Sequence, residues 1–193
     1  YGKVQHQIET LATVLEERGI RVHRPEPSRL SPEEMAHMAD LQKGSTFLFS
    51  RDPTIVIGNH IIEASLKLPM RAKEIFTARR IIRTILKEGE AEYAAVPSVS
   101  PAFRDDNIYL EGGDVMLNGS EIYVGNSGNA SSEAGIEWLQ NYLGSEYNVE
   151  EIRLKNFEHL DCVLSLIRPG LGLICPEAIV GELPPALAVW EFI

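Results

Sequence analysis

The 193 residues are enough for one domain with a substantial hydrophobic core. The net charge of −10, from 18 basic and 28 acidic residues, argues against nucleic acids and anionic membranes as partners. The composition, 44% hydrophobic and 24% charged, is typical of a soluble globular protein, and the two cysteines give no disulfide framework.

The chain carries no visible signal for export or membrane insertion. No apolar run approaches the length of a transmembrane helix, and no signal peptide is recognisable at the start. We therefore expect a cytoplasmic protein. The sequence begins at Tyr1 without a methionine and stops inside the apolar run 188–193, so we expect it to continue beyond the residues given.

The N-terminal quarter predicts helices and short strands. Apolar residues recur at helical spacing over residues 3–18, and Gly19 is a natural stop. A short strand is expected at 20–23. Ser31-Pro-Glu-Glu has a capping-box pattern with proline at the first helical position, so a short helix should follow. A further strand is expected at 46–49.

Two hairpins are indicated in the middle of the chain. Residues 54–57 and 60–63 flank Gly58-Asn59. The second hairpin, 111–124, turns at Asn118-Gly119, and Asn-Gly between apolar runs is a strong hairpin signal. Just before that hairpin stands Glu111-Gly-Gly-Asp114, two acids at the mouth of a buried strand, which makes them candidates for chemistry.

The remaining elements alternate between helices and strands, with a loop at 97–110. The helices are expected at 71–88, from Ser131 or Ser132 to Leu143, and at 176–187, and the strands at 91–96, 148–154, 163–167, 171–175 and 189–193.

These elements form a repeat. Residues 54–96, 114–154 and 161–193 each read strand, strand, helix, strand, and the helix and strand at 3–23 look like half of one more unit. The sequence therefore predicts about three and a half α/β units of the ββαβ type.

The repeat aligns three acids, Asp52, Asp114 and Asp161, near the first strand of successive units. If the units are related by rotation, these carboxylates meet in one pocket and repel one another unless a cation binds there. A guanidinium suits such a pocket because it is permanently charged and pairs with two carboxylate oxygens at once.

His159 is the expected general acid and base, because imidazole titrates near working pH and Asp161 follows two residues later. Glu111 is its expected partner, holding the ring in one tautomer. The other four histidines are expected to be ordinary core or surface residues. Cys162 and Cys175 are interpreted as core residues rather than as a nucleophile.

At this point the residues resemble a known family. The run Phe49-Ser-Arg51-Asp52-Pro to Glu63, then Arg71 and Arg79-Arg80, is similar to the amidinotransferases, glycine amidinotransferases above all. Glu111-Gly-Gly-Asp114, Gly135-Ile-Glu-Trp138 and His159-Leu-Asp161 follow in the same order. The wider group is the pentein superfamily, with arginine deiminases and dimethylarginine dimethylaminohydrolases.

The resemblance implies a pentein-type α/β propeller of five ββαβ units, here incomplete, as a single domain over residues 1–193. It implies a cysteine that takes the amidino group from arginine and passes it to a small amine such as glycine, with no metal and no cofactor. His159 would be the acid and base, Glu111 its partner, and Asp52 and Asp161 the guanidinium ligands. Asp114 would be a binding or a structural acid. A homodimer is implied by the family alone.

Two departures from the family pattern leave alternatives open. The family's cysteine lies beyond the position where this sequence stops, and an arginine of some amidinotransferases is here Ala178. Glu111 follows the deiminase form, where glycine amidinotransferase has an aspartate. A guanidine hydrolase that releases citrulline, or ornithine and ammonia, is the first alternative, and a non-enzymatic binding protein is the second.

Overall fold

The computed structural model describes residues 2–24, 31–33, 35–36, 49–99 and 107–193. Its architecture is mixed α/β, with three small sheets of three strands each. Each sheet is formed by one contiguous stretch of chain. No helix in the described ranges is long and apolar enough to cross a membrane.

The three stretches share one order of elements, strand, strand, helix, strand, as the sequence predicts. In each, the first two strands pair antiparallel, and the second and third pair parallel across the helix. The elements are β1 (Thr54–Ile57), β2 (His60–Glu63), α3 (Ile75–Glu88) and β3 (Glu92–Ala95); β4 (Val115–Asn118), β5 (Glu121–Asn126), α4 (Glu133–Leu143) and β6 (Asn148–Arg153); β7 (Leu164–Arg168), β8 (Leu171–Ile174), α5 (Pro185–Ala188) and β9 (Glu191–Phe192).

Both predicted hairpins are confirmed. Ile57 pairs with His60, so Gly58-Asn59 forms the two-residue turn, and Gly58 has a φ of 56°. In the second hairpin Asn118 pairs with Glu121, which shifts the turn to Gly119-Ser120. Gly119 has a φ of 64°, a left-handed conformation that glycine adopts without strain.

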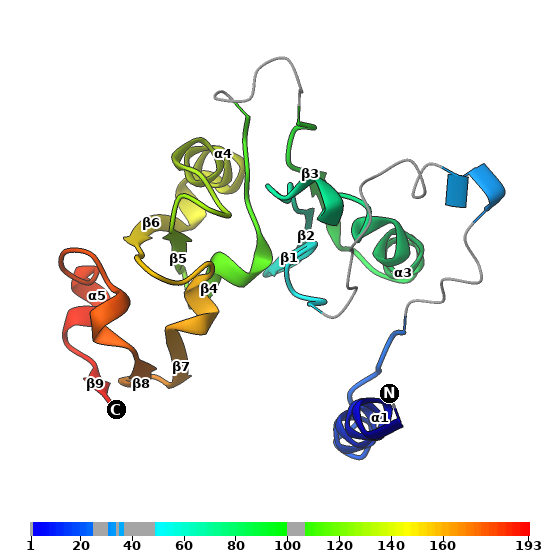
Figure 1. Cartoon of the computed structure of the whole chain (residues 1–193), viewed down its shortest axis with the longest axis horizontal. Coiled ribbons are helices and arrows are strands. Elements are labelled where there is room, and N and C mark those ends of the chain that lie inside the picture. The colour runs from blue at the N-terminus through cyan, green and yellow to red at the C-terminus, as the bar shows by residue number, and fades with distance from the viewer. Residues whose placement is uncertain (1, 25–30, 34, 37–48, 100–106) are drawn as a thin grey trace.

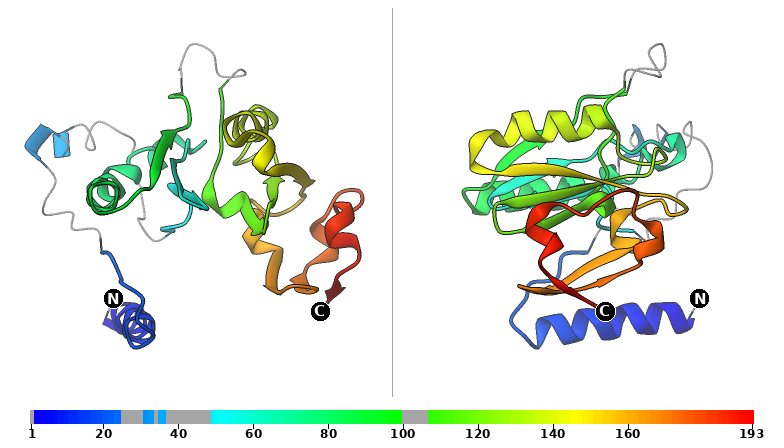
Figure 2. Two further views of the ribbon diagram at one scale, coloured as in Figure 1. Left: turned by 180° about the vertical axis from the view of Figure 1, so that it is seen from behind. Right: turned by 90° about the vertical axis from the view of Figure 1, so that its left-hand side faces the viewer.

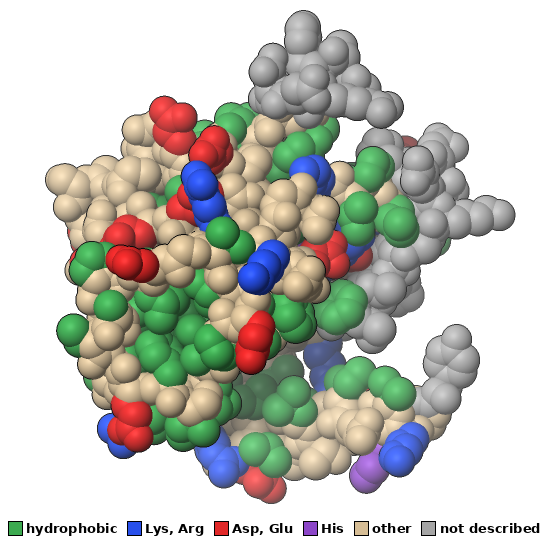
Figure 3. All heavy atoms as spheres, turned by 60° about the vertical axis from the view of Figure 1, so that its left-hand side comes forward, with side chains coloured by type: hydrophobic (Ala, Val, Ile, Leu, Met, Phe, Trp, Pro, Cys, Tyr) green, Lys and Arg blue, Asp and Glu red, His purple; other side chains and the backbone are tan. Residues whose placement is uncertain are grey.

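The units lie side by side around a common middle (Figure 1). Helices α3 and α4 lie on the outside, while β1, β4 and β7 are turned inward. Residues of these three first strands line one cavity of about 510 Å³. The main core fills the space between the first two units, and a second core joins β4–β6 to the third unit. On the face in Figure 3, hydrophobic side chains gather in a patch, with acidic and basic side chains interspersed around it.

The N-terminal helix α1 (Gly2–Glu16) is set apart from the three units, as Figures 1 and 2 show. Ala12 is its buried residue, and the apolar positions Val4, Ile8 and Leu11 are exposed. The strand prediction for residues 20–23 is wrong, because this described segment pairs with no strand. Residues 46–48 of the strand predicted at 46–49 lie outside the described residues.

The prediction of one helix over residues 176–187 is also wrong. A 3-10 turn covers Pro176–Ala178, and α5 is confined to four residues. The backbone in between pairs elsewhere: Val180 N donates to Arg153 O (2.9 Å), and Lys155 N donates to Ala178 O (2.9 Å). Proline at 184 and 185 then removes two further helical donors. The helix expected at 71–88 begins at Ile75, after a 3-10 turn over Pro69–Arg71.

Candidate active site

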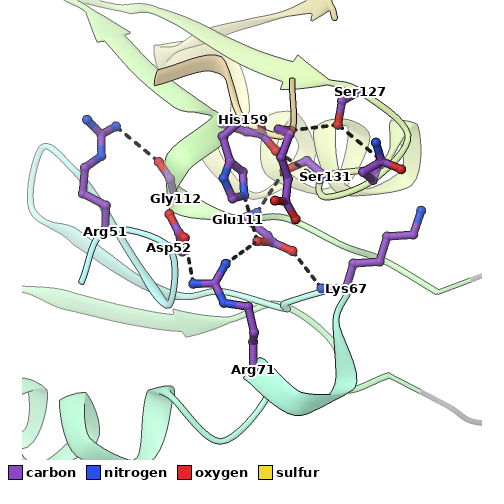
Figure 4. A network of polar contacts seen from close by, with 12 residues as sticks. Arg51, Asp52, Lys67, Arg71, Glu111, Gly112, Ser127, Ser131 and His159 are labelled. Atoms are coloured by element: carbon purple, nitrogen blue, oxygen red, sulfur yellow. Dashed lines mark hydrogen bonds and ion pairs between the residues drawn. The ribbon is translucent and has the colours of Figure 1, made fainter. Parts of the chain in front are cut away.

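The candidate residues stand at the entrances to the three units. Asp52 lies two residues before β1. Glu111 precedes a 3-10 turn, Gly112–Asp114, that leads into β4. His159 precedes the matching turn, Leu160–Cys162, that leads into β7. The first strands of the three units line the same cavity. Glu111 and His159, 48 positions apart in the sequence, therefore come together (Figure 4).

His159 and Glu111 form a buried pair. Nε2 of the imidazole lies 2.9 Å from Oε2 of Glu111. His159 is 7% exposed and Glu111 is 2% exposed. The other carboxylate oxygen accepts the backbone N–H of Lys67 at 2.8 Å. The backbone N–H of Glu111 donates to Ser131 Oγ at 3.0 Å, so the acid is held at both ends.

The electrostatics of the pair favour a charged imidazole. Burial on its own would lower the pKa of His159. The hydrogen bond to Glu111 and the negative charges of Asp114 and Asp52 outweigh that penalty and raise the pKa to about 9. His159 therefore carries its proton at neutral pH and is ready to act as an acid.

Gly113 allows Asp52 to approach His159 closely. A Cβ built at Gly113 would lie 2.7 Å from Asp52 Oδ1 and 2.9 Å from Cγ of the imidazole. No side chain fits in that space. The second glycine of Glu111-Gly-Gly-Asp114 thus leaves room for the side chains of Asp52 and His159.

Arg71 is the site residue that reasoning from the sequence missed. Its Nη2 donates to Asp52 Oδ2 (2.7 Å), and its Nη1 lies 3.6 Å from Glu111 Oε2. Glu74 holds the same guanidinium from the side, at Nε (3.1 Å) and Nη2 (2.9 Å). Although burial opposes the charge, the hydrogen bonds that Arg71 donates to Glu74 and Asp52 raise its pKa above the ordinary value. Arg71 belongs to the amidinotransferase-like run, but the sequence assigns it no role there, and a glutamate follows three residues later.

Asp161 lies at the edge of this group rather than inside it. Its side chain is about one third exposed, at 32%, and its Oδ2 lies 3.9 Å from Arg51 Nε. Arg51 also donates to the backbone oxygens of Gly112 (3.2 Å) and Val115 (2.8 Å). Asp161 and Arg51 both line the cavity between the first strands. Of the acids predicted to bind a guanidinium, Asp161 is the one open to a ligand.

Comparison with protein families fits this geometry. The family model described as arginine deiminase matches residues 40–187, well over half of the chain. The chain belongs to the arginine deiminase family. The pentein resemblance read from the sequence is thereby confirmed.

Individual relatives of this family member are amidinotransferases. A putative inosamine-phosphate amidinotransferase of Streptomyces griseus is 28% identical over 98% of this chain and 58% of its own length. The mitochondrial glycine amidinotransferase of Gallus gallus is 27% identical over 89% of the chain and 46% of its own length. A solved amidinotransferase from the saxitoxin pathway of Microseira wollei has a TM-score of 0.78 at 25% identity, covering 98% of this chain and 61% of that one. The chain spans about half the length of the curated relatives it matches.

Asp114 of this family member is enclosed. It is 0% exposed, and its carboxylate accepts the backbone N–H groups of Ser131 (3.1 Å) and Leu160 (3.1 Å). Burial raises its pKa to about 6, although the bonds from Ser131 and the charge on His159 work in the other direction. Of the two roles left open by the sequence, the geometry favours a structural acid that ties the entrance of the third unit to the second.

The interpretation of Cys162 as a core residue is wrong, since its side chain is exposed. Although the residue is exposed, its Sγ is partly shielded from solvent and lies 3.7 Å from Asp161 Oδ1; this partial desolvation and the negative charge of Asp161 raise its pKa. A raised pKa disfavours the reactive thiolate. Cys175 is half-buried against the second core, as expected of a packing residue.

Asp52, Glu111 and His159 could in principle hold a metal ion, because one ligand atom from each lies within 4.8 Å of the others. The guanidinium of Arg71 already donates to Asp52 and faces Glu111. A metal ion there would have to compete with that cation and with the proton on His159. Asp52, Glu111 and His159 are thus a poor metal site, and an organic cation at the cavity beside Asp161 fits these residues better.

Proposed function

We propose that this chain is part of an enzyme that transfers the amidino group of arginine to a small acceptor amine through a cysteine-bound intermediate. The observation that carries the proposal is the buried His159–Glu111 hydrogen bond beside Asp52, with Asp161 at the open edge. The amidinotransferases among its relatives support the same reaction class.

In the proposed first step, a thiolate attacks the guanidinium carbon of arginine and forms a sulfur–carbon bond. The bond from that carbon to the ornithine nitrogen breaks, and its electron pair leaves with the nitrogen. The His159 imidazolium gives that nitrogen a proton, which its pKa of about 9 suits. Asp161 pairs with the substrate guanidinium.

In the proposed second step, the acceptor amine attacks the amidino carbon and gives its proton to the now neutral His159. The sulfur–carbon bond breaks, and the thiolate is restored. Since the chain spans about half the length of the curated relatives it matches, we propose that the thiolate of this reaction belongs to a cysteine outside the 193 residues.

A guanidine hydrolase is the second candidate, and the arginine deiminase family model favours it. Here water replaces the acceptor amine in the second step. If the thiol displaces ammonia rather than ornithine in the first step, the product is citrulline. Glu111 also fits a hydrolase, because the resemblance places a glutamate at this position in the deiminases and an aspartate in glycine amidinotransferase.

Product analysis separates the candidates. The full-length protein is incubated with arginine labelled with ¹³C at the guanidinium carbon, with and without glycine or lysine as acceptor, and the products are identified by mass. Label in guanidinoacetate or homoarginine, with ornithine released, supports transfer. Labelled citrulline or urea without dependence on an amine supports hydrolysis. No turnover under either condition would overturn both.

A further inference from the structure

Arg71 is the centre of a buried group of charges. The residue is 8% exposed, and its guanidinium reaches three carboxylates from two units: Asp52 and Glu74 of the first, and Glu111 at the entrance of the second. Figure 4 shows Arg71 opposite His159, with Glu111 between them. Arg71 and His159 therefore approach the same carboxylate oxygen of Glu111, Oε2, at 3.6 Å and 2.9 Å.

This group holds more carboxylates than cations. The carboxylates of Asp52, Glu74 and Glu111 face the guanidinium of Arg71 and the imidazolium of His159, and Asp114 adds a further acid next to His159. A bound guanidinium would offset part of this excess. Without Arg71, the three carboxylates would face the single cation His159, and burying charges without partners is costly.

Glu74 fixes the orientation of the guanidinium. It is 2% exposed and bonds Nε and Nη2 side-on, a geometry that only a planar fork can satisfy. The Phe49 ring lies 5.4 Å from the guanidinium carbon. With its plane held this way, Arg71 presents Nη2 to Asp52 and Nη1 to Glu111.

We propose that Arg71, oriented by Glu74, is a positioning residue that holds Glu111 against His159 and turns Asp52 toward the substrate. This rests on the proposed function, because it assigns Arg71 a place in the same site. One consequence concerns Asp52: the bond from Arg71 to Oδ2 fixes how this carboxylate is turned.

Arg79 supplies a matched control. It lies on α3, the helix that follows the turn carrying Arg71, and forms a two-point pair with Glu63, which also accepts a bond from the Tyr93 hydroxyl (2.5 Å). This pair joins α3 to the first sheet and touches neither Glu111 nor His159 through any of these bonds. The Arg79→Met variant therefore shows how much stability the protein loses when an arginine–glutamate pair away from His159 is removed.

The test is a ¹³C NMR titration of the His159 imidazole in the full-length protein, with its signal assigned by the His159→Asn variant. It is measured in Arg71→Met, Arg71→Lys, Glu74→Gln and Arg79→Met. The groups that face His159 are Glu111, Asp114 and Asp52. If Arg71 positions Glu111, Arg71→Met weakens the His159–Glu111 bond, and the pKa falls by roughly one unit or more toward its ordinary value.

The other variants separate position from charge. Arg71→Lys keeps the charge but loses the fork, so the pKa should fall there as well, and Glu74→Gln should give a smaller fall. Arg79→Met should lower the melting temperature and leave the pKa of His159 unchanged. A rise of that pKa in Arg71→Met would mean that Arg71 acts through charge alone, and no change would mean that it only supports the fold. Either result overturns the proposal.

Should Arg71→Met fail to fold, the Lys and Gln variants carry the same test. The NMR titration needs no turnover. The proposal on Arg71 can therefore be overturned while the proposed reaction stands, and it can be supported even if the enzyme catalyses a different reaction. Where turnover is measurable, the acidic and basic limbs of the kcat profile should shift with the NMR titration.

Discussion

At the residue scale, the site depends on His159 holding a proton that it can release. The proton stays because Glu111 and two neighbouring aspartates outweigh the cost of burial. We expect His159→Asn in the full-length protein to lower kcat by about 10²–10⁴-fold, the usual contribution of a general acid and base. Circular dichroism should be unchanged, and undiminished turnover would remove His159 from the mechanism.

The same proton makes stability depend on pH. The pKa of His159 is about 9 in the folded protein against 6.5 ordinarily, so the folded state binds this proton more tightly. The resulting stabilisation, roughly 3 kcal/mol at most, is fully present below pH 6.5 and is lost as pH rises through about 9. Asp114, with its pKa near 6, titrates below this window.

Urea unfolding between pH 6.5 and 9.5 measures the effect. The free energy of unfolding of the unaltered protein should fall with rising pH, and that of His159→Gln should fall less steeply. Parallel curves for the two proteins would contradict the assignment of this proton to His159.

The pairing of His159 with Glu111 could be predicted from the sequence, but Arg71 could not. Histidine and glutamate stand out beside a glycine pair and a following aspartate. Arg71 lies in a stretch that resembles the start of an amphipathic helix, where an arginine is ordinary. Two of its buried partners, Asp52 and Glu74, lie in its own unit, and the packing of the first unit against the second adds Glu111.

At the element scale, hairpins and the long helix were predictable because their signals are local. The turn glycines and alternating strands decide the two predicted hairpins. The failures, residues 20–23 and 176–187, depend on distant partners. The first has no described strand to pair with, and the second gives its backbone groups to residues 153–155.

Gly135 shows how one element is fitted to another. A Cβ at this position on α4 would lie 1.9 Å from the backbone oxygen of Tyr109, in the segment that leads to Glu111. We expect Gly135→Ala to destabilise the protein by about 1–3 kcal/mol, because the helix and this backbone must move apart. Chemical denaturation provides the measurement.

Gly89 serves as the comparison, since a Cβ there would meet Ile85 O at an ordinary 3.5 Å. Gly89→Ala should stay within about 0.5 kcal/mol of the unaltered protein. Equal losses in the two variants would show that the close approach at Gly135 is not what matters.

At the scale of the whole molecule, three units contribute to one site that holds more carboxylates than cations. We expect arginine to raise the melting temperature of the full-length protein, by the equivalent of about 2.7 kcal/mol at 100 times its Kd. Citrulline, which is neutral, should raise it less. Asp161→Asn should weaken the effect of arginine, and equal shifts with both ligands would argue against charge as the basis of binding.

The contiguous units also give the site an order of assembly during synthesis. Asp52, Arg71 and Glu74 leave the ribosome together with the first unit, and their ion pairs can close before the rest is made. Glu111 arrives with the second unit and His159 with the third. A nascent chain that ends before residue 159 thus holds the acids and Arg71 without the imidazolium, and Glu111 gains its proton donor last.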